Sequence, residues 1–100
     1  MATRTFVEID SGAATVALAA ASGTKRHVLI GYSIVGTGAG TVEFRSNTTP
    51  LTGEMVTASG VQLKDNLSSG LMETVAGEAL NLTIATAGVD GYAIVDTFDN

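Results

Sequence analysis

The sequence predicts a small all-β domain, an antiparallel β-sandwich of jelly-roll-like form with about eight strands. Short segments alternate between apolar and polar residues with a period of two, as half-buried strands do. Turns that contain glycine separate these segments. No helical period of apolar residues extends beyond two turns. One hundred residues are enough for one domain, residues 1–100.

Two segments near the N-terminus each allow two interpretations. Thr5–Ile9 fits a first strand, or an extended N-terminal arm that spans residues 1–10. In Ala13–Ala21 the alanines favour helix, whereas Thr15 and Val16 favour a strand. We expect a strand in the second segment, because glycines bracket it at a strand-length distance.

The centre of the chain predicts a β-hairpin. The residues of Arg26–Val35 that would share one face are Val28, Ile30, Tyr32 and Ile34, and those on the other face are His27, Leu29, Gly31 and Ser33. The glycine-rich stretch 36–40 supplies a reversal. Thr41–Ser46 then predicts a strand with Val42 and Phe44 inward and Glu43 and Arg45 outward.

The second half of the chain predicts five more strands. These are Met55–Ser59, Val61–Lys64, Leu71–Val75, Ala79–Thr86 and Tyr92–Phe98. The alternation is strongest in Ala79–Thr86, where Leu80, Leu82 and Ile84 would face the core. Polar loops at Asn47–Glu54 and Asp65–Gly70 connect the strands.

The candidate chemical groups do not form a catalytic or cofactor-binding motif. The glycine-rich stretch 36–40 precedes a strand and not a helix, which favours a turn over a phosphate site. His27 is the sole histidine and is expected on a strand surface. Calcium binding by Asp96, Asp99 and Asn100 lacks a loop motif. We therefore expect no enzyme activity, no metal and no cofactor.

The composition of the chain limits the kinds of partner that it is expected to bind. The formal net charge of −5, with five scattered basic residues, opposes nucleic-acid binding. The longest apolar stretch, Ala13–Ala21, is too short to span a bilayer. The absence of cysteine suits synthesis in a reducing cytoplasm. Of five aromatic residues, Tyr32 and Phe44 fit core positions, so little aromatic surface is expected for binding sugars.

From Lys25 to about Ile94 the chain resembles small β-sandwich virion proteins of tailed phages. The matching stretches are 26–35, 41–46, 48–53 and 71–82, and the most specific is Glu73-Thr74-Val75-Ala76-Gly77-Glu78-Ala79-Leu80-Asn81-Leu82. Such proteins look like capsid decoration, or cement, proteins. The resemblance implies a homotrimer that binds the major capsid protein on the outside of the head. It implies no catalytic residues.

A decoration protein should make its contacts through exposed segments. The candidates are Ala2, Thr3, Arg4, Thr5, Phe6, Glu8, Asn47, Thr48, Thr49, Pro50, Leu51, Asn66, Leu67 and Ser68. Two alternatives stay open. One is a tail or fibre module that binds a host glycan, and the other is a small enzyme with a cleft of converging polar groups.

Overall fold

The structure is a computed structural model that describes residues 2–66 and 72–99. Over these residues the chain forms ten strands. They are β1 (Ala2–Ser11), β2 (Thr15–Ala19), β3 (Arg26–Gly36), β4 (Gly40–Ser46), β5 (Thr49–Pro50), β6 (Met55–Thr57), β7 (Gln62–Asn66), β8 (Met72–Glu73), β9 (Leu80–Ala85) and β10 (Val89–Phe98). This part of the chain contains no helix of the length and apolar character that crossing a membrane requires.

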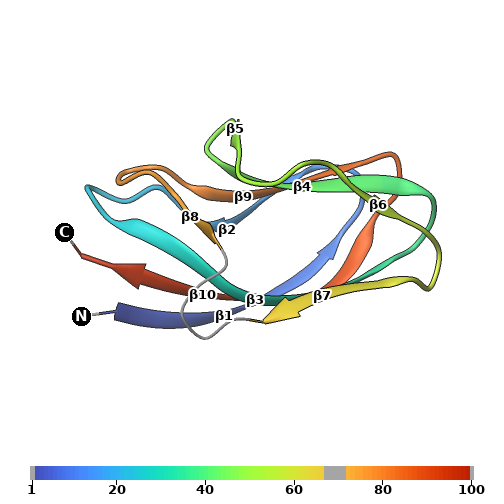
Figure 1. Ribbon diagram of the computed structural model, residues 1–100, viewed down its shortest axis with the longest axis horizontal. Helices are drawn as coiled ribbons and strands as arrows, with labels where there is room; N and C mark the ends of the chain where they lie inside the picture. The colour runs from blue at the N-terminus through green and yellow to red at the C-terminus, as the bar shows by residue number, and fades with distance from the viewer. Residues whose placement is uncertain (1, 67–71, 100) are drawn as a thin grey trace.

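The strands form two antiparallel sheets that face each other (Figure 1). Sheet A has the order β1-β10-β3-β7, and β8 also pairs with β3. Sheet B has the order β2-β9-β4-β5, and β6 also pairs with β4. β7 and β8 lie along the same side of β3, and β5 and β6 lie along the same side of β4, so the ten strands occupy eight positions, four in each sheet. This arrangement confirms the predicted jelly-roll-like sandwich.

The core lies between the sheets. Its buried side chains come from both layers: Ile9, Leu29, Ile34, Val89, Ala93 and Val95 from sheet A, and Leu18, Val42, Phe44, Leu80, Leu82 and Ile84 from sheet B. The inward positions predicted for β4 and β9 are confirmed. Each large side chain contributes about 1.5–3 kcal/mol by leaving water.

The predicted hairpin of β3 and β4 is wrong. β3 pairs with β10, β7 and β8 in sheet A, whereas β4 pairs with β9, β5 and β6 in sheet B. The glycine-rich stretch therefore carries the chain from one sheet to the other. A Cβ on Gly36 would lie 2.7 Å from the carbonyl oxygen of Ala58, and one on Gly40 would lie 2.4 Å from that of Ala85. The glycines are needed because three connections crowd this end of the sandwich.

The predicted alternation of β3 is wrong at its N-terminal end. The register with β10 shifts, so that Ile94 is opposite Gly31 and Val95 is opposite Leu29. Ile30 is the extra residue of a β-bulge, and a bulge reverses the faces on one side of it. His27 and Leu29 therefore share the inner side with the core residue Ile34, and His27 is buried rather than on the surface.

The alternatives at the N-terminus are resolved in favour of strands. Residues 2–11 form β1, which pairs with β10 along its whole length and is not a free arm. The alanine-rich segment forms β2. β10 begins at Val89, three residues before the prediction. Of the predicted strand Leu71–Val75 only Met72–Glu73 pairs, and Leu71 lies outside the described residues.

Candidate functional site: the outer face of sheet A

The outer face of sheet A carries the most conspicuous group of exposed side chains. Register places alternate residues of β1 and β10 side by side on this face: Arg4 beside Asp96, Phe6 beside Ile94, Glu8 beside Tyr92 and Asp10 beside Asp90. β3 and β7 continue the rows, with Gly31 opposite Asn66 and Ser33 opposite Lys64. The intervening residues of β10, Ala93 and Val95, face the core.

An aromatic patch occupies the middle of this face. We define it as Phe6, Tyr92 and Ile94. The rings of Phe6 and Tyr92 stack with their centroids 5.0 Å apart. Phe6 is 65% exposed and Tyr92 is 38% exposed, so both rings present apolar area to solvent. The expectation of little aromatic surface is therefore wrong. Clustered aromatic residues on a surface are typical of binding sites.

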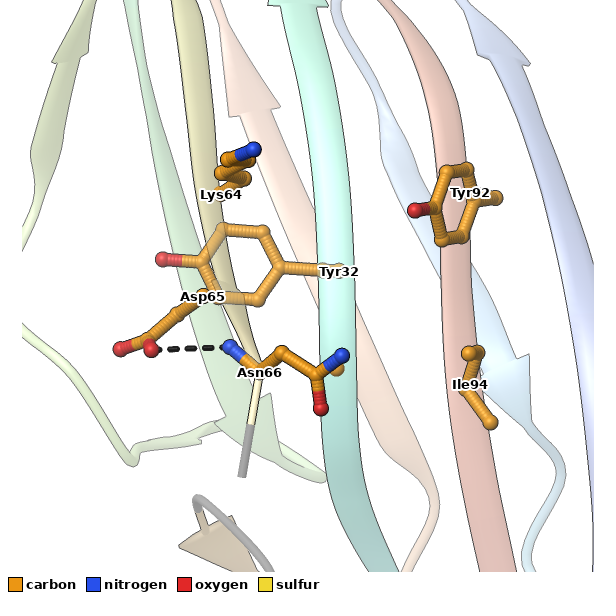
Figure 2. A pocket seen from close by; sticks show the side chains of 7 residues that line it. Tyr32, Lys64, Asp65, Asn66, Tyr92 and Ile94 are labelled. Carbon is orange, nitrogen blue, oxygen red and sulfur yellow. Dashed lines mark hydrogen bonds between the residues drawn. The ribbon is translucent and has the colours of Figure 1, made fainter. Parts of the chain in front are cut away.

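A hollow of about 320 Å³ adjoins the aromatic patch (Figure 2). Figure 2 shows Tyr92 and Ile94 of β10 on one side, and Lys64 and Asn66 of β7 on the other. Gly31 of β3 lies between them. The hollow exists because this position lacks a side chain: a Cβ there would lie 3.7 Å from the Asn66 side chain. The hollow thus combines an aromatic edge with amide and ammonium groups.

An ion pair borders the aromatic patch at one end. Arg4 donates from Nε to Oδ1 of Asp96 at 2.8 Å and from Nη2 to Oδ2 at 3.0 Å. The Arg4 hydrogen bond lowers the pKa of Asp96, although partial burial works against this effect. The same contact raises the pKa of Arg4. Both groups are therefore charged at neutral pH.

Two carboxyl groups border the opposite end. Asp10 and Asp90 are directly opposite each other on β1 and β10. A side-chain hydrogen bond with Asp10, partial burial and like charge together raise the pKa of Asp90. Such a bond requires one of the two carboxyls to be protonated, so it forms only as the pH falls. The aromatic patch thus lies between the Arg4–Asp96 ion pair, whose two charges cancel, and the Asp10–Asp90 pair, which carries net negative charge at neutral pH.

His27 belongs to the internal support of the fold. Its Nε2 bonds the carbonyl oxygen of Ala20 at 2.9 Å, so Nε2 donates. Its Nδ1 forms a hydrogen bond with the Thr97 hydroxyl at 2.8 Å. The backbone N–H of His27 donates to the Thr74 hydroxyl. Both ring nitrogens are therefore engaged in joining β3 to β10 and to the segment before β3.

The predicted contact residues fall on different surfaces. Arg4, Phe6, Glu8 and Asn66 lie on the outer face of sheet A, whereas Thr3 and Thr5 alternate with them and are also exposed. Asn47, Thr48, Thr49, Pro50 and Leu51 lie at the β4–β5 turn of sheet B, away from β1 (Figure 1). For Ala2 the structure gives the pairing with Phe98, while Leu67 and Ser68 lie outside the described residues.

Sequence reasoning missed Tyr92, Ile94 and Lys64 as surface residues of the site. The sequence of β10 does show period-two alternation, because Ala93 and Val95 alternate with Tyr92 and Ile94. Both sets are apolar, so the alternation did not indicate which one faces the core.

The acids considered for calcium do not converge. Asp96 bonds Arg4, and Asp99 lies 3.4 Å from Nζ of Lys25. Asn100 lies outside the described residues. Within residues 2–66 and 72–99, His, Asp and Glu form no group of three that could hold a metal ion.

Comparison with known proteins gives a distant likeness. No protein-family model matches the chain, and no curated protein matches it. A solved structure with a similar fold is the virus-like particle of extra small virus from the giant freshwater prawn Macrobrachium rosenbergii. The identity is 12% and the TM-score is 0.49, over 100% of this chain and 79% of that chain. A likeness this distant leaves the function open.

Proposed function

We propose that this protein is a non-catalytic structural component of a virion, a phage capsid decoration protein that binds the outside of the head. The observation that carries the proposal is the aromatic patch on the outer face of sheet A. The sequence resemblance to phage decoration proteins supports it. The protein would be made in the host cytoplasm and would act on the assembled shell.

The aromatic patch has the composition of a protein–protein contact. Interface cores are enriched in aromatic residues and depleted in charge, and a polar rim surrounds them. Here Phe6, Tyr92 and Ile94 form the apolar centre, while Arg4 with Asp96 and Asp10 with Asp90 form the rim. A rigid sheet presents this centre without ordering a loop, which keeps the entropic cost of binding low. The partner we propose is the major capsid protein.

The resemblance further implies a homotrimer. Three copies on one site of the shell would bind through three patches at once, and linked weak contacts reinforce one another. Such a clamp would hold neighbouring capsomers together against internal pressure.

Particle biochemistry tests the proposal. Purified virions should contain this chain, and shells that lack it should bind the purified protein. Phe6→Ser should reduce the bound copies at least about tenfold, because truncation of a central aromatic typically costs more than 1.4 kcal/mol. The matched control is Val56→Ser, at a side chain that is 75% exposed on β6 of sheet B. Virions without the chain, or equal binding by both variants, would refute the proposal.

One observation favours a second candidate, a tail or fibre module that binds a host glycan. The hollow beside Gly31 offers the Tyr92 ring, the Asn66 amide and the Lys64 ammonium, which are groups that bind sugars. A glycan array probed with the protein would give hits that Tyr92→Ala abolishes. An array without hits would eliminate this candidate.

A further inference from the structure

Among residues 2–66 and 72–99, no strand pairs with the second side of β1, so β1 is an edge strand of sheet A. It pairs with β10 on one side only, over ten residues and with no shift of register. The other side therefore presents a regular row of backbone N–H and C=O groups. Such a row is a template for pairing with another strand.

The other edges of the sandwich carry features that limit pairing. At the edge of sheet B, β2 has five residues and a register shift. The opposite edge consists of β5, with two residues and Pro50, and β6, with three. At the far edge of sheet A, β7 has five residues and includes Lys64. Among the described strands, β1 alone forms a long edge without proline, lysine or a bulge.

We propose that β1 pairs with β1 of a second copy of this chain, antiparallel and with Phe6 opposite Phe6 across a two-fold axis. In that register Arg4 lies opposite Glu8 of the second copy, and Glu8 lies opposite its Arg4. The outer face of β1 is therefore complementary to itself. An isologous contact needs this property, because the same surface serves both partners.

Neighbouring registers fit less well. A shift of one residue would place outward residues opposite inward ones. A shift by two would place Phe6 opposite either Arg4 or Glu8 of the second copy. Only the Phe6–Phe6 register combines an aromatic pair with unlike charges in both neighbouring rows.

The proposed register extends interactions that already exist in each copy. Arg4 would lie between Asp96 of its own chain and Glu8 of the second copy, which gives an alternating row of charges. Its contact with Asp96 uses Nε and Nη2, so Nη1 is available for Glu8. The two aromatic patches would meet at Phe6 and form one continuous surface. The pairing closes with two chains, so it is a contact separate from any trimer and does not rest on the proposed function.

The absence of cysteine makes the register directly testable. Directly opposite residues in an antiparallel pair have Cα atoms about 4.5–5.5 Å apart, which suits a disulfide. Phe6→Cys should therefore form a disulfide-linked dimer under mild oxidation. Val56→Cys, at a site on sheet B that is at least as exposed as Phe6, should stay mostly unlinked. The proposal would be overturned if both variants formed the disulfide-linked dimer equally, or if Phe6→Cys formed none.

Charge exchange tests the pairing without relying on Phe6. The wild-type mass in solution, measured by sedimentation, should correspond to an even number of chains at high concentration. Glu8→Arg and Arg4→Glu should each reduce this association at least about tenfold, since each places like charges opposite. An equimolar mixture of the two variants should restore it as a heterodimer. The control is Glu54→Arg, which makes the same change of charge at a position outside β1 and should leave association unchanged.

These outcomes separate the two proposals. Circular dichroism verifies that each variant is folded, and Glu8→Arg keeps the Arg4–Asp96 pair intact. Loss of pairing in Glu8→Arg with normal capsid binding would support the edge contact alone. A wild-type chain that is monomeric or strictly trimeric would refute the edge contact while leaving capsid binding open. A mixture that fails to restore association would also refute it.

Discussion

Two aspartates on the outer side of β10 have opposite surroundings at the residue scale. Asp96 accepts two hydrogen bonds from Arg4, which lower its pKa. Asp90 is opposite Asp10, which raises its pKa. At neutral pH the ionised Asp96 therefore stabilises the folded protein, whereas the ionised Asp90 destabilises it.

Replacement of these aspartates should have opposite effects on the free energy of unfolding. Asp90→Asn should stabilise the protein at neutral pH, because it removes an anion that Asp10 repels. The advantage should vanish as the pH falls through the raised pKa of Asp90, since the wild-type carboxyl is then protonated. Urea unfolding midpoints at neutral and acid pH measure this difference.

Asp96→Asn is the matched control, on the same face of the same strand. It should destabilise the protein at neutral pH, because the charge partner of Arg4 is lost. The deficit should disappear only below the lowered pKa of Asp96, where the wild-type carboxyl is also neutral. Equal shifts of the two variants would contradict the assigned environments.

At the scale of elements, β3 and β10 form the centre of sheet A, and their pairing depends on close backbone approach. Gly91 has φ +150°, and a Cβ there would lie 1.9 Å from the carbonyl oxygen of Ser33. Three residues further along β10, the register shift after Ile94 begins. The extra residue of this bulge lies in β3, so the alternation of β10 continues unbroken, and the bulge adds local twist to the strand pair.

Gly91→Ala should destabilise the protein by at least ~2 kcal/mol, because strand β3 must move to admit the methyl group. The measurement is the unfolding midpoint in urea. Gly12→Ala is the control, since a Cβ at Gly12 has no neighbour within 4 Å. A small effect at Gly91, comparable to that at Gly12, would show that the strands separate more easily than this geometry implies.

The molecule as a whole depends on the layer of side chains shared by its two sheets. Phe44 and Leu82 of sheet B are opposite each other in the register and fully buried. The ring of Phe44 contacts that of Tyr32 in sheet A, with centroids 4.9 Å apart. Burial raises the pKa of Tyr32, and Asp65 adds to the effect. No single strand of the described chain could bury these groups alone.

Leu82→Ala should reduce the free energy of unfolding by about 2–5 kcal/mol, because it removes apolar contacts and leaves a cavity between the sheets. Domains of this size have roughly 5–15 kcal/mol in total, so the variant should be near the limit of stability. Thermal or urea unfolding measures the loss. Val56→Ala, at an exposed position, should stay within about 0.5 kcal/mol of the wild type.

The sequence by itself determined the all-β class, the approximate position of most strands and the inward residues of β4 and β9. Period-two alternation between apolar and polar residues is a local property, so Leu80, Leu82 and Ile84 could be assigned without knowledge of their partners. It also predicted residues 2–8 as a contact segment, and these residues lie in the edge strand β1.

Only the tertiary structure decided which strands pair, and with them the candidate site. Where both alternating sets are apolar, as in Tyr92–Val95, or where a bulge reverses the faces, as at Ile30, local pattern does not indicate the buried side. The separation of β3 and β4 into different sheets depends on partners distant in sequence. The aromatic patch therefore became visible only when β1 and β10, at opposite ends of the chain, were placed side by side.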